Sequence, residues 1–368
     1  MKKLTEKYLP MALFVLIGAI GGIMITRVTE ELDDMNFILS LLAGVVLFYI
    51  AMYLQIIIHE GGHCIFGLLS GYKFVSFRVG SLILVRTKDG IRLKRYSLAG
   101  TGGQCLMEPP GSCGDDFPVV LYNMGGVIIN LIAAALFWGL SFLCKGNPFL
   151  HVFCLLMIVT GVGFALINGI PMKMGAPNDG LNTIDLMKNP HAKRAFWISM
   201  KVNAMITDGI NVADMPDEWF VIPGKEDYDS GIVSYIPYAA SDRLVAQGKH
   251  EEASALRKQV EKDFTGMPGV YRAILKSEDI YYELTHENRP EVINELYDAD
   301  FAKTAKQMRS MLPVLRMECV KAKLHDRDEA LFRKNMDAYE KILKDYPYET
   351  EGRTDKRLLD EALGKVQA

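Results

Sequence analysis

The chain has 368 residues, enough for two or three domains, and its formal net charge of −3 argues against a nucleic-acid binder. The charges are unevenly distributed, because residues 1–180 carry 24 charged side chains and residues 181–368 carry 61. Long charge-free runs in the first part predict a membrane-embedded region, and the charged second part predicts a soluble one. This division argues against a purely cytosolic enzyme and against a secreted protein.

Four apolar runs predict membrane-spanning helices, near residues 8–28, 36–70, 117–144 and 148–172. A helix rises 1.5 Å per residue and needs about 20 residues to cross about 30 Å of hydrocarbon. Because three lysines precede the first run, a signal peptide is an alternative there. The run is long for a signal peptide and no A-x-A cleavage pattern follows it, so we expect an uncleaved helix.

The loop over residues 72–116 contains two alternating segments, 74–79 and 91–94, and an Asp89-Gly90 turn between them. This pattern predicts a small β-element, and an amphipathic loop on anionic lipid is the alternative. The loop and the N-terminus hold most of the basic residues of the first 180. We therefore expect a multi-pass protein of the cell membrane, with the N-terminus, this loop and the C-terminal region in the cytoplasm.

The second apolar run continues into His59-Glu60-Gly61-Gly62-His63, an H-E-x-x-H motif. On a helix the two histidines lie one turn apart on one face and can share one Zn²⁺, while Glu60 can take the proton of a metal-bound water. Such polar residues are costly in an apolar membrane segment, which favours function over simple pairing with neighbouring helices. The two intervening glycines provide either clearance for a substrate or close packing of two helices.

A catalytic zinc usually has three protein ligands, so a third must lie elsewhere in the chain. Asp179 is the only acid between Asp116 and Asp185, and it follows a stretch rich in proline and glycine that ends the fourth run. We expect this carboxylate to turn inward at the depth of the two histidines. An Asx-turn or a helix N-cap is the alternative role of Asp179.

His59-Glu60-Gly61-Gly62-His63 in a membrane helix, followed by Asn168, Pro171 and Asp179-Gly180, resembles the site-2 protease family of intramembrane zinc metalloproteases. The resemblance implies that His59, His63 and Asp179 bind Zn²⁺ and that Glu60 activates water. It also implies that the scissile peptide bond lies within the bilayer or at its edge. The loop before Asp179 is longer than usual for the family, and Asn178 replaces an apolar residue.

Two asparagines are further candidate site residues. Asn130 ends a segment, Gly125 to Asn130, that resembles a family element facing the active site, and Asn168 resembles the asparagine of the family's Asn-x-x-Pro element. Either side chain could orient the substrate backbone or an oxyanion, and an interhelical hydrogen bond is the alternative for each. The segment 98–107 resembles the β-segment along which substrates of the family extend.

Residues 186–368 have helical sequence patterns, and some segments are similar to tetratricopeptide repeats, although no clean 34-residue period is present. The predicted fold is therefore an α-helical polytopic membrane domain over residues 1–185, with about four spans and a small cytoplasmic β-element, followed by an all-α soluble domain. The second domain would dock a partner or gate access, or form a solvated cap without a partner.

These features predict a zinc metalloendopeptidase that cleaves a membrane-anchored protein or peptide in or near its membrane segment. Release of a tethered regulator and trimming of a signal remnant or small peptide are both compatible with the sequence. The competing hypothesis is a catalytically silent membrane scaffold that binds a partner through its C-terminal helical domain. No ligand of the predicted zinc site is missing, which favours the enzyme.

Overall fold

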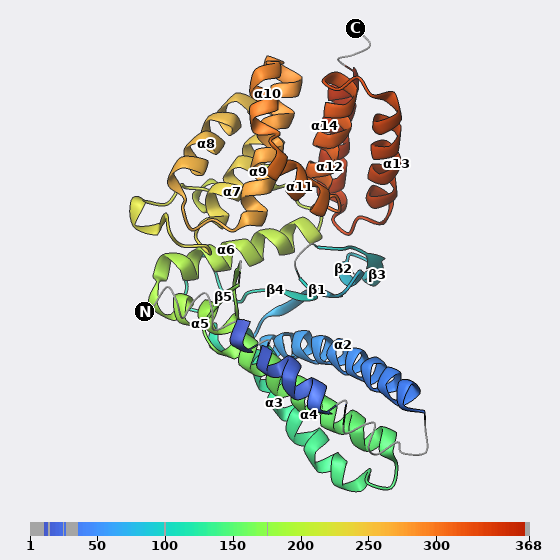
Figure 1. Cartoon of the computed structure of the whole chain (residues 1–368). Helices are drawn as coiled ribbons and strands as arrows, with labels where there is room; N and C mark the ends of the chain where they lie inside the picture. The colour runs from blue at the N-terminus through green and yellow to red at the C-terminus, as the bar shows by residue number, and fades with distance from the viewer. Residues whose placement is uncertain are drawn as a thin grey trace. The chain divides into compact units, whose positions relative to one another are not determined.

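The computed structural model describes residues 11–13, 15–24, 26, 36–98, 101–174 and 176–364 (Figure 1). The chain forms two compact units. The first unit contains Met1–Lys73 and Asp115–Asn189, and the second contains Phe74–Gly114 and Pro190–Ala368.

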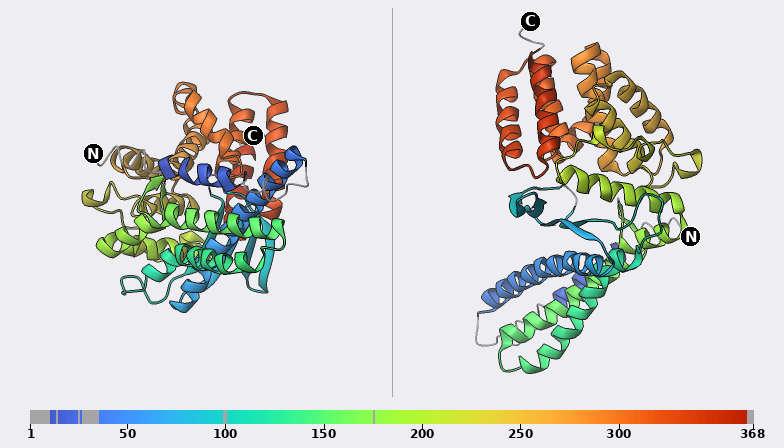
Figure 2. Two further views of the ribbon diagram at one scale, coloured as in Figure 1. Left: turned by 60° about the horizontal axis from the view of Figure 1, so that its bottom comes forward. Right: turned by 180° about the vertical axis from the view of Figure 1, so that it is seen from behind.

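The first unit is built around long helices, of which α3 and α4 lie side by side in both views of Figure 2. Asn36 caps the first turn of α2, and Asn147, followed by proline, caps α4, as expected for helix starts. The elements are α2 Phe37–Leu69, α3 Val120–Leu143, α4 Pro148–Gly169, β5 Lys173–Met174, β6 Ala176–Pro177 and α5 Asp179–Lys188.

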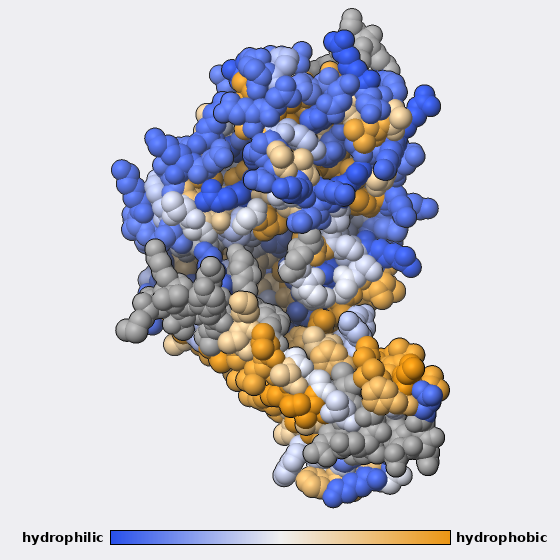
Figure 3. Space-filling model, viewed as in Figure 1, coloured by the Kyte–Doolittle hydropathy of each residue, from blue (hydrophilic) through white to orange (hydrophobic). Residues whose placement is uncertain are grey.

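Three helices of the described residues, α2, α3 and α4, are long and apolar enough to cross a membrane. Their most apolar 18-residue windows are only 17%, 33% and 44% buried, and Figure 3 shows apolar side chains over their surface. Exposed apolar surface of this extent is typical of helices that lie in a lipid bilayer. Three predicted spans are thus confirmed as apolar helices. The first, near 8–28, lies partly outside the described residues, which include a shorter apolar helix at Met11–Met24.

The predicted β-element is confirmed as a four-stranded sheet of order β3-β2-β1-β4, with antiparallel β1–β2 and β2–β3 pairs. The turn between β2 and β3 is Lys88-Asp89, one residue before the predicted Asp89-Gly90, because Gly90 already pairs with Thr87 as the first residue of β3. Gly90 has a φ of 114°, which favours glycine. The strands are β1 Lys73–Val79, β2 Leu82–Thr87, β3 Gly90–Arg95 and β4 Gly103–Glu108.

This sheet belongs to the second unit, whereas the sequence-based division placed residues 72–116 with the membrane helices. Polar contacts explain the difference. Lys201 of α6 (Pro190–Thr207) forms an ion pair of 2.5 Å with Glu108 of β4. The sheet therefore continues into the charged C-terminal part of the chain, although it follows α2 in sequence.

The remainder of the second unit is helical, as predicted. Helix α12 packs against α9, α13 and α14, and the core between them contains the fully buried side chains of Met317, Tyr339 and Leu359. A likeness to tetratricopeptide repeats stays a prediction. The helices are α7 Tyr235–Ala246, α8 His250–Asp263, α9 Gly269–Tyr282, α10 Pro290–Leu296, α11 Ala299–Gln307, α12 Leu312–Leu324, α13 Glu329–Asp345 and α14 Glu349–Gly364, with short helical turns at Val212–Asp214, Asp217–Trp219, Lys225–Asp227 and Glu283–Glu287.

Candidate metal centre

The structure brings His59, His63 and Asp179 together inside the first unit. The histidines lie one turn apart on α2, and Asp179 is the first residue of α5. Asp179 Oδ2 lies 3.1 Å from His59 Nε2 and 3.5 Å from His63 Nε2, and the two Nε2 atoms are 3.2 Å apart. Three ligand atoms at such separations could hold one metal ion.

The hydrogen bonds of the two imidazoles determine which nitrogens face this centre. His63 Nδ1 lies 2.8 Å from the carbonyl oxygen of Tyr122, which can only accept, so Nδ1 carries the proton. His59 Nδ1 lies 2.7 Å from Asn130 Oδ1, and Asn130 Nδ2 donates to Gln55 Oε1 at 2.6 Å. With both rings neutral, each Nε2 would direct its lone pair at the centre, as a metal ligand requires.

Asp179 is the third member of the centre. Its Oδ2 is buried and accepts no hydrogen bond of good geometry from the described residues. This oxygen and the two Nε2 atoms converge on one point, an arrangement that a bound cation would satisfy.

The two glycines of the motif have different surroundings, one matching close helix packing and the other matching clearance for a substrate. A Cβ on Gly62 would lie 2.3 Å from the backbone oxygen of Gly125 on α3, so this glycine allows α2 and α3 to pack closely. A Cβ on Gly61 would meet no atom within 4 Å, which leaves clearance beside the motif. Gly126 leaves room for the His59 ring, since a Cβ there would lie 2.4 Å from it.

The loop that delivers Asp179 is held by Asn178. Its Oδ1 accepts a hydrogen bond from Leu181 N at 3.0 Å, and its Nδ2 donates to the carbonyls of Ile167 and Ile170 at 2.6 Å each. Asn178, not Asp179, is thus the N-cap of α5, and Asp179 at the first helical position remains available to the centre.

The remaining predicted residues lie in different settings. Glu60 is half-buried and follows His59 directly on α2. Asn130 is fully buried and contacts His59, as described above. Asn168 Nδ2 instead donates to the carbonyl of Phe164, one turn earlier in its own helix, at 3.0 Å. The structure therefore joins Asn130, but not Asn168, to the histidines.

Gln55 is a site residue that the sequence analysis missed. It is fully buried, binds Asn130 through its Oε1, and donates from Nε2 to the Met157 carbonyl at 2.9 Å. Its spacing could have revealed it, because positions 55, 59 and 63 recur every four residues on one face of α2. The hydrogen bond between His63 and the Tyr122 carbonyl could not be predicted in this way, because every residue has a backbone carbonyl and the sequence does not show which one is used.

Comparison with protein-family models, curated proteins and solved structures finds no match to this chain. The chemistry of the centre is therefore argued from its geometry and from the types of residue that form it.

We expect Asn130→Ala to lower the affinity of the centre for a divalent metal ion by about 10–100-fold, because His59 loses the group that fixes its ring and tautomer. Asn168→Ala is the matched control, since it removes one hydrogen bond within α4 and should leave the affinity unchanged. Competition with a coloured zinc chelator measures both values. Equal affinities in the two variants would contradict the assigned role of Asn130.

Proposed function

We propose that this chain is an intramembrane zinc metalloendopeptidase of the site-2 protease type. The observation that carries the proposal is the convergence of His59 Nε2, His63 Nε2 and Asp179 Oδ2 within a unit of membrane-length helices. Ionisable residues inside apolar surroundings are energetically costly, and their presence there usually marks a functional site.

The distances fit a tetrahedral zinc ion. Ligand atoms about 2.0–2.1 Å from a tetrahedral ion lie about 3.3 Å from one another. The three separations here are 3.1, 3.2 and 3.5 Å. Two imidazoles and one carboxylate are also a usual catalytic zinc set with one position left for water, whereas magnesium and calcium prefer oxygen ligands alone.

Glu60 is the proposed general base, because it follows the ligand His59 in the H-E-x-x-H motif. Zinc, when bound, lowers the pKa of a coordinated water and polarises a substrate carbonyl. The Glu60 carboxylate would accept the proton of the attacking water and return it to the leaving amine. His59 and His63 would keep their Nδ1 protons on Asn130 and the Tyr122 carbonyl throughout, which holds both rings in place.

The place of the motif on α2 suggests where cleavage occurs. At 1.5 Å per residue the 33 residues of α2 extend about 50 Å, more than the hydrocarbon thickness of about 30 Å. His59 and His63 lie near the C-terminal end of this helix, followed by the basic loop. We propose that this end is cytoplasmic, that the N-terminus and the C-terminal region are also cytoplasmic, and that a membrane-anchored protein or peptide is cut near that surface.

The C-terminal helices would bind a partner protein. Consecutive helices pack in pairs, α7 with α8 and α12 with α13, as in tetratricopeptide arrays. The rival hypothesis, a silent scaffold, shares this partner but does not require a metal centre. The full ligand set beside Glu60 favours the enzyme.

Metal removal tests the proposal. Protein purified in detergent should cleave a membrane-anchored reporter, lose that activity after treatment with a zinc chelator, and regain it when zinc is restored. Mg²⁺ should fail to restore it, because the centre offers two nitrogen ligands. Cleavage that persists without bound metal would contradict the proposal.

A further inference from the structure

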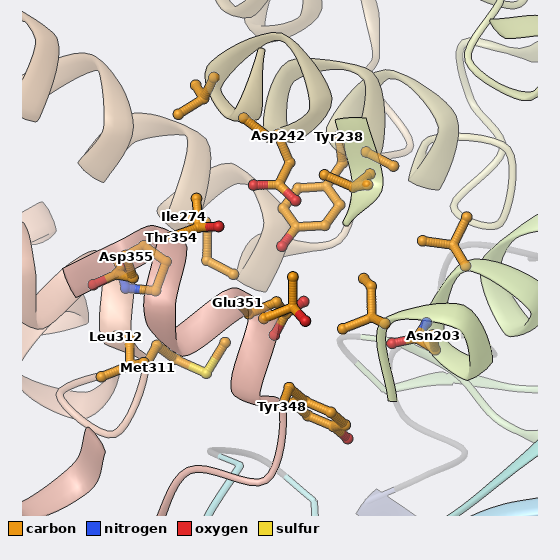
Figure 4. A pocket seen from close by; sticks show the side chains of 18 of the residues that line it. Asn203, Tyr238, Asp242, Ile274, Met311, Leu312, Tyr348, Glu351, Thr354 and Asp355 are labelled. Carbon is orange, nitrogen blue, oxygen red and sulfur yellow. The ribbon is translucent and has the colours of Figure 1, made fainter. Parts of the chain in front are cut away.

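A cavity of about 260 Å³ lies inside the second unit, where α7, α9, α12 and α14 meet the sheet and α6. Figure 4 shows Asp242 and Glu351 among the side chains directed into it. The volume is slightly below the roughly 300–1,000 Å³ of pockets for drug-sized ligands, so the cavity suits one side chain or one small molecule.

The lining of this cavity has an excess of negative charge. Among its described residues, Arg316 is the one cationic side chain, against four carboxylates. Arg316 is 1% exposed and is already engaged, since it forms an ion pair with Asp355 at 3.0 Å and another with Glu278. Asp242 and Glu351 are therefore left without a cationic partner.

Asp242 is exposed to the open space of the cavity. Its carboxylate points into the cavity (Figure 4) and forms no hydrogen bond or ion pair with the described residues. Glu351 receives one hydrogen bond, from the Tyr346 hydroxyl at 3.2 Å. The protein packed around Asp242, and next the charge of Glu278, raises the pKa of Asp242 above its ordinary value, and contact with solvent in the cavity limits that rise. Burial, and next the charge of Asp242, raises the pKa of Glu351 to about 8.

Tyrosine rings form much of the remaining wall. Tyr238 and Tyr271 stack with ring centres 4.5 Å apart, and Tyr346 and Tyr348 meet edge to face at 5.8 Å. The faces of aromatic rings attract ammonium and guanidinium groups, and carboxylates beside them add to this attraction.

The spacing of the carboxylates distinguishes an organic cation from a metal ion. Among the described residues, no three of these carboxylates bring ligand oxygens within 4.8 Å of one another, unlike the three ligands of the metal centre. A divalent metal would therefore lack a compact set of ligands. A larger cation with several hydrogen-bond donors can reach carboxylates that lie further apart.

We propose that this cavity binds one organic cation, an ammonium or guanidinium group, between Asp242 and Glu351 and against the surrounding tyrosines. A lysine or arginine side chain of a peptide and a free diamine share this chemistry. The proposal does not depend on the metal centre, so the two can fail independently.

Calorimetric titration of the full chain in an uncharged detergent tests the proposal. The probes are putrescine, the blocked peptide acetyl-Gly-Lys-Gly-amide, and 1,4-butanediol as an uncharged analogue of putrescine. We expect at least one of the two amines to bind and the diol not to bind. Binding of the peptide alone identifies a peptide side chain as the ligand, and binding of putrescine alone identifies a free amine.

Isosteric variants locate the binding. Asp242→Asn and Glu351→Gln should each weaken amine binding by about tenfold or more, because each removes a hydrogen-bonded charge partner. Glu361→Gln, an exposed position on the same helix as Glu351, is the matched control and should bind as the wild type does. Asp242→Asn breaks no hydrogen bond with the described residues, so its thermal midpoint should not fall.

The protonation of the cavity gives a second readout. A bound cation favours the charged carboxylates, so binding should release protons, and affinity should rise between about pH 6 and 8. Titrations in buffers of different ionisation enthalpy measure the protons released. The titratable and charged groups that line the cavity around Asp242 and Glu351 are Glu278, Arg316, Asp355 and the tyrosines 96, 235, 238, 271, 346 and 348.

Three results would overturn the proposal. They are the absence of binding by both amines at millimolar concentration, amine binding that both cavity variants leave unchanged, and binding of Ca²⁺ in place of either amine.

Discussion

Glu60→Gln should lower cleavage of a membrane-anchored reporter by about 10²–10⁴-fold while the chain keeps its zinc. The glutamine has nearly the shape of the glutamate, but it cannot accept a proton from the attacking water, and general-base catalysis contributes about this factor. Because Glu60 is not one of the three grouped ligands, metal content should not change. Cleavage rate and zinc per chain are measured on the same preparation.

The zinc measurement makes this variant informative. A slow variant that retains zinc assigns Glu60 to proton transfer. A variant that cleaves at the wild-type rate would show that another group serves as base, and loss of zinc would place Glu60 among the ligands instead.

Gly62→Ala should destabilise the chain and remove its zinc, whereas Gly61→Ala should do neither. A methyl group on Gly62 would meet the backbone of Gly125 at 2.3 Å, and a backbone contact cannot be relieved by turning a side chain. Overpacking of this kind costs about 1–3 kcal/mol or more, and here it moves α3, which carries Asn130.

The neighbouring glycine is an internal control for this effect. Gly61 has open space where the methyl group would lie, and alanine is favoured over glycine in a helix interior by about 1 kcal/mol. The two substitutions therefore have opposite expected signs, although the positions are adjacent. Thermal unfolding in detergent compares them, and equal midpoints would contradict the close contact between α2 and α3.

The ligands themselves could be predicted because their signals are local or rare. His59 and His63 are related by helix geometry alone, and Asp179 stands out as an isolated acid after a helix-breaking stretch. The β2–β3 hairpin likewise follows from a short pattern, although its turn lies one residue earlier than predicted, at Lys88-Asp89. The structure places these residues as expected, while the chemistry assigned to them stays a prediction.

The supporting contacts could not be predicted in the same way, because they join distant parts of the chain. The chain from Met157 through Gln55 and Asn130 to His59 crosses three helices, and no single segment contains its pattern. The association of the sheet with the second unit depends on contacts such as Lys201–Glu108, 93 residues apart. The charged side chains of the acidic cavity also come from four helices. In the sequence, each of these side chains taken alone resembles an ordinary surface charge.

The central claim is that His59, His63 and Asp179 bind one zinc ion, and the most direct test is the zinc content of purified chains. Wild type should contain about one zinc per chain, Asp179→Asn should lose it, and Asp185→Asn, on the same helix, should keep it. Wild-type protein without zinc after metal-replete purification would contradict the account, as would an Asp179→Asn variant that binds zinc as tightly as the wild type.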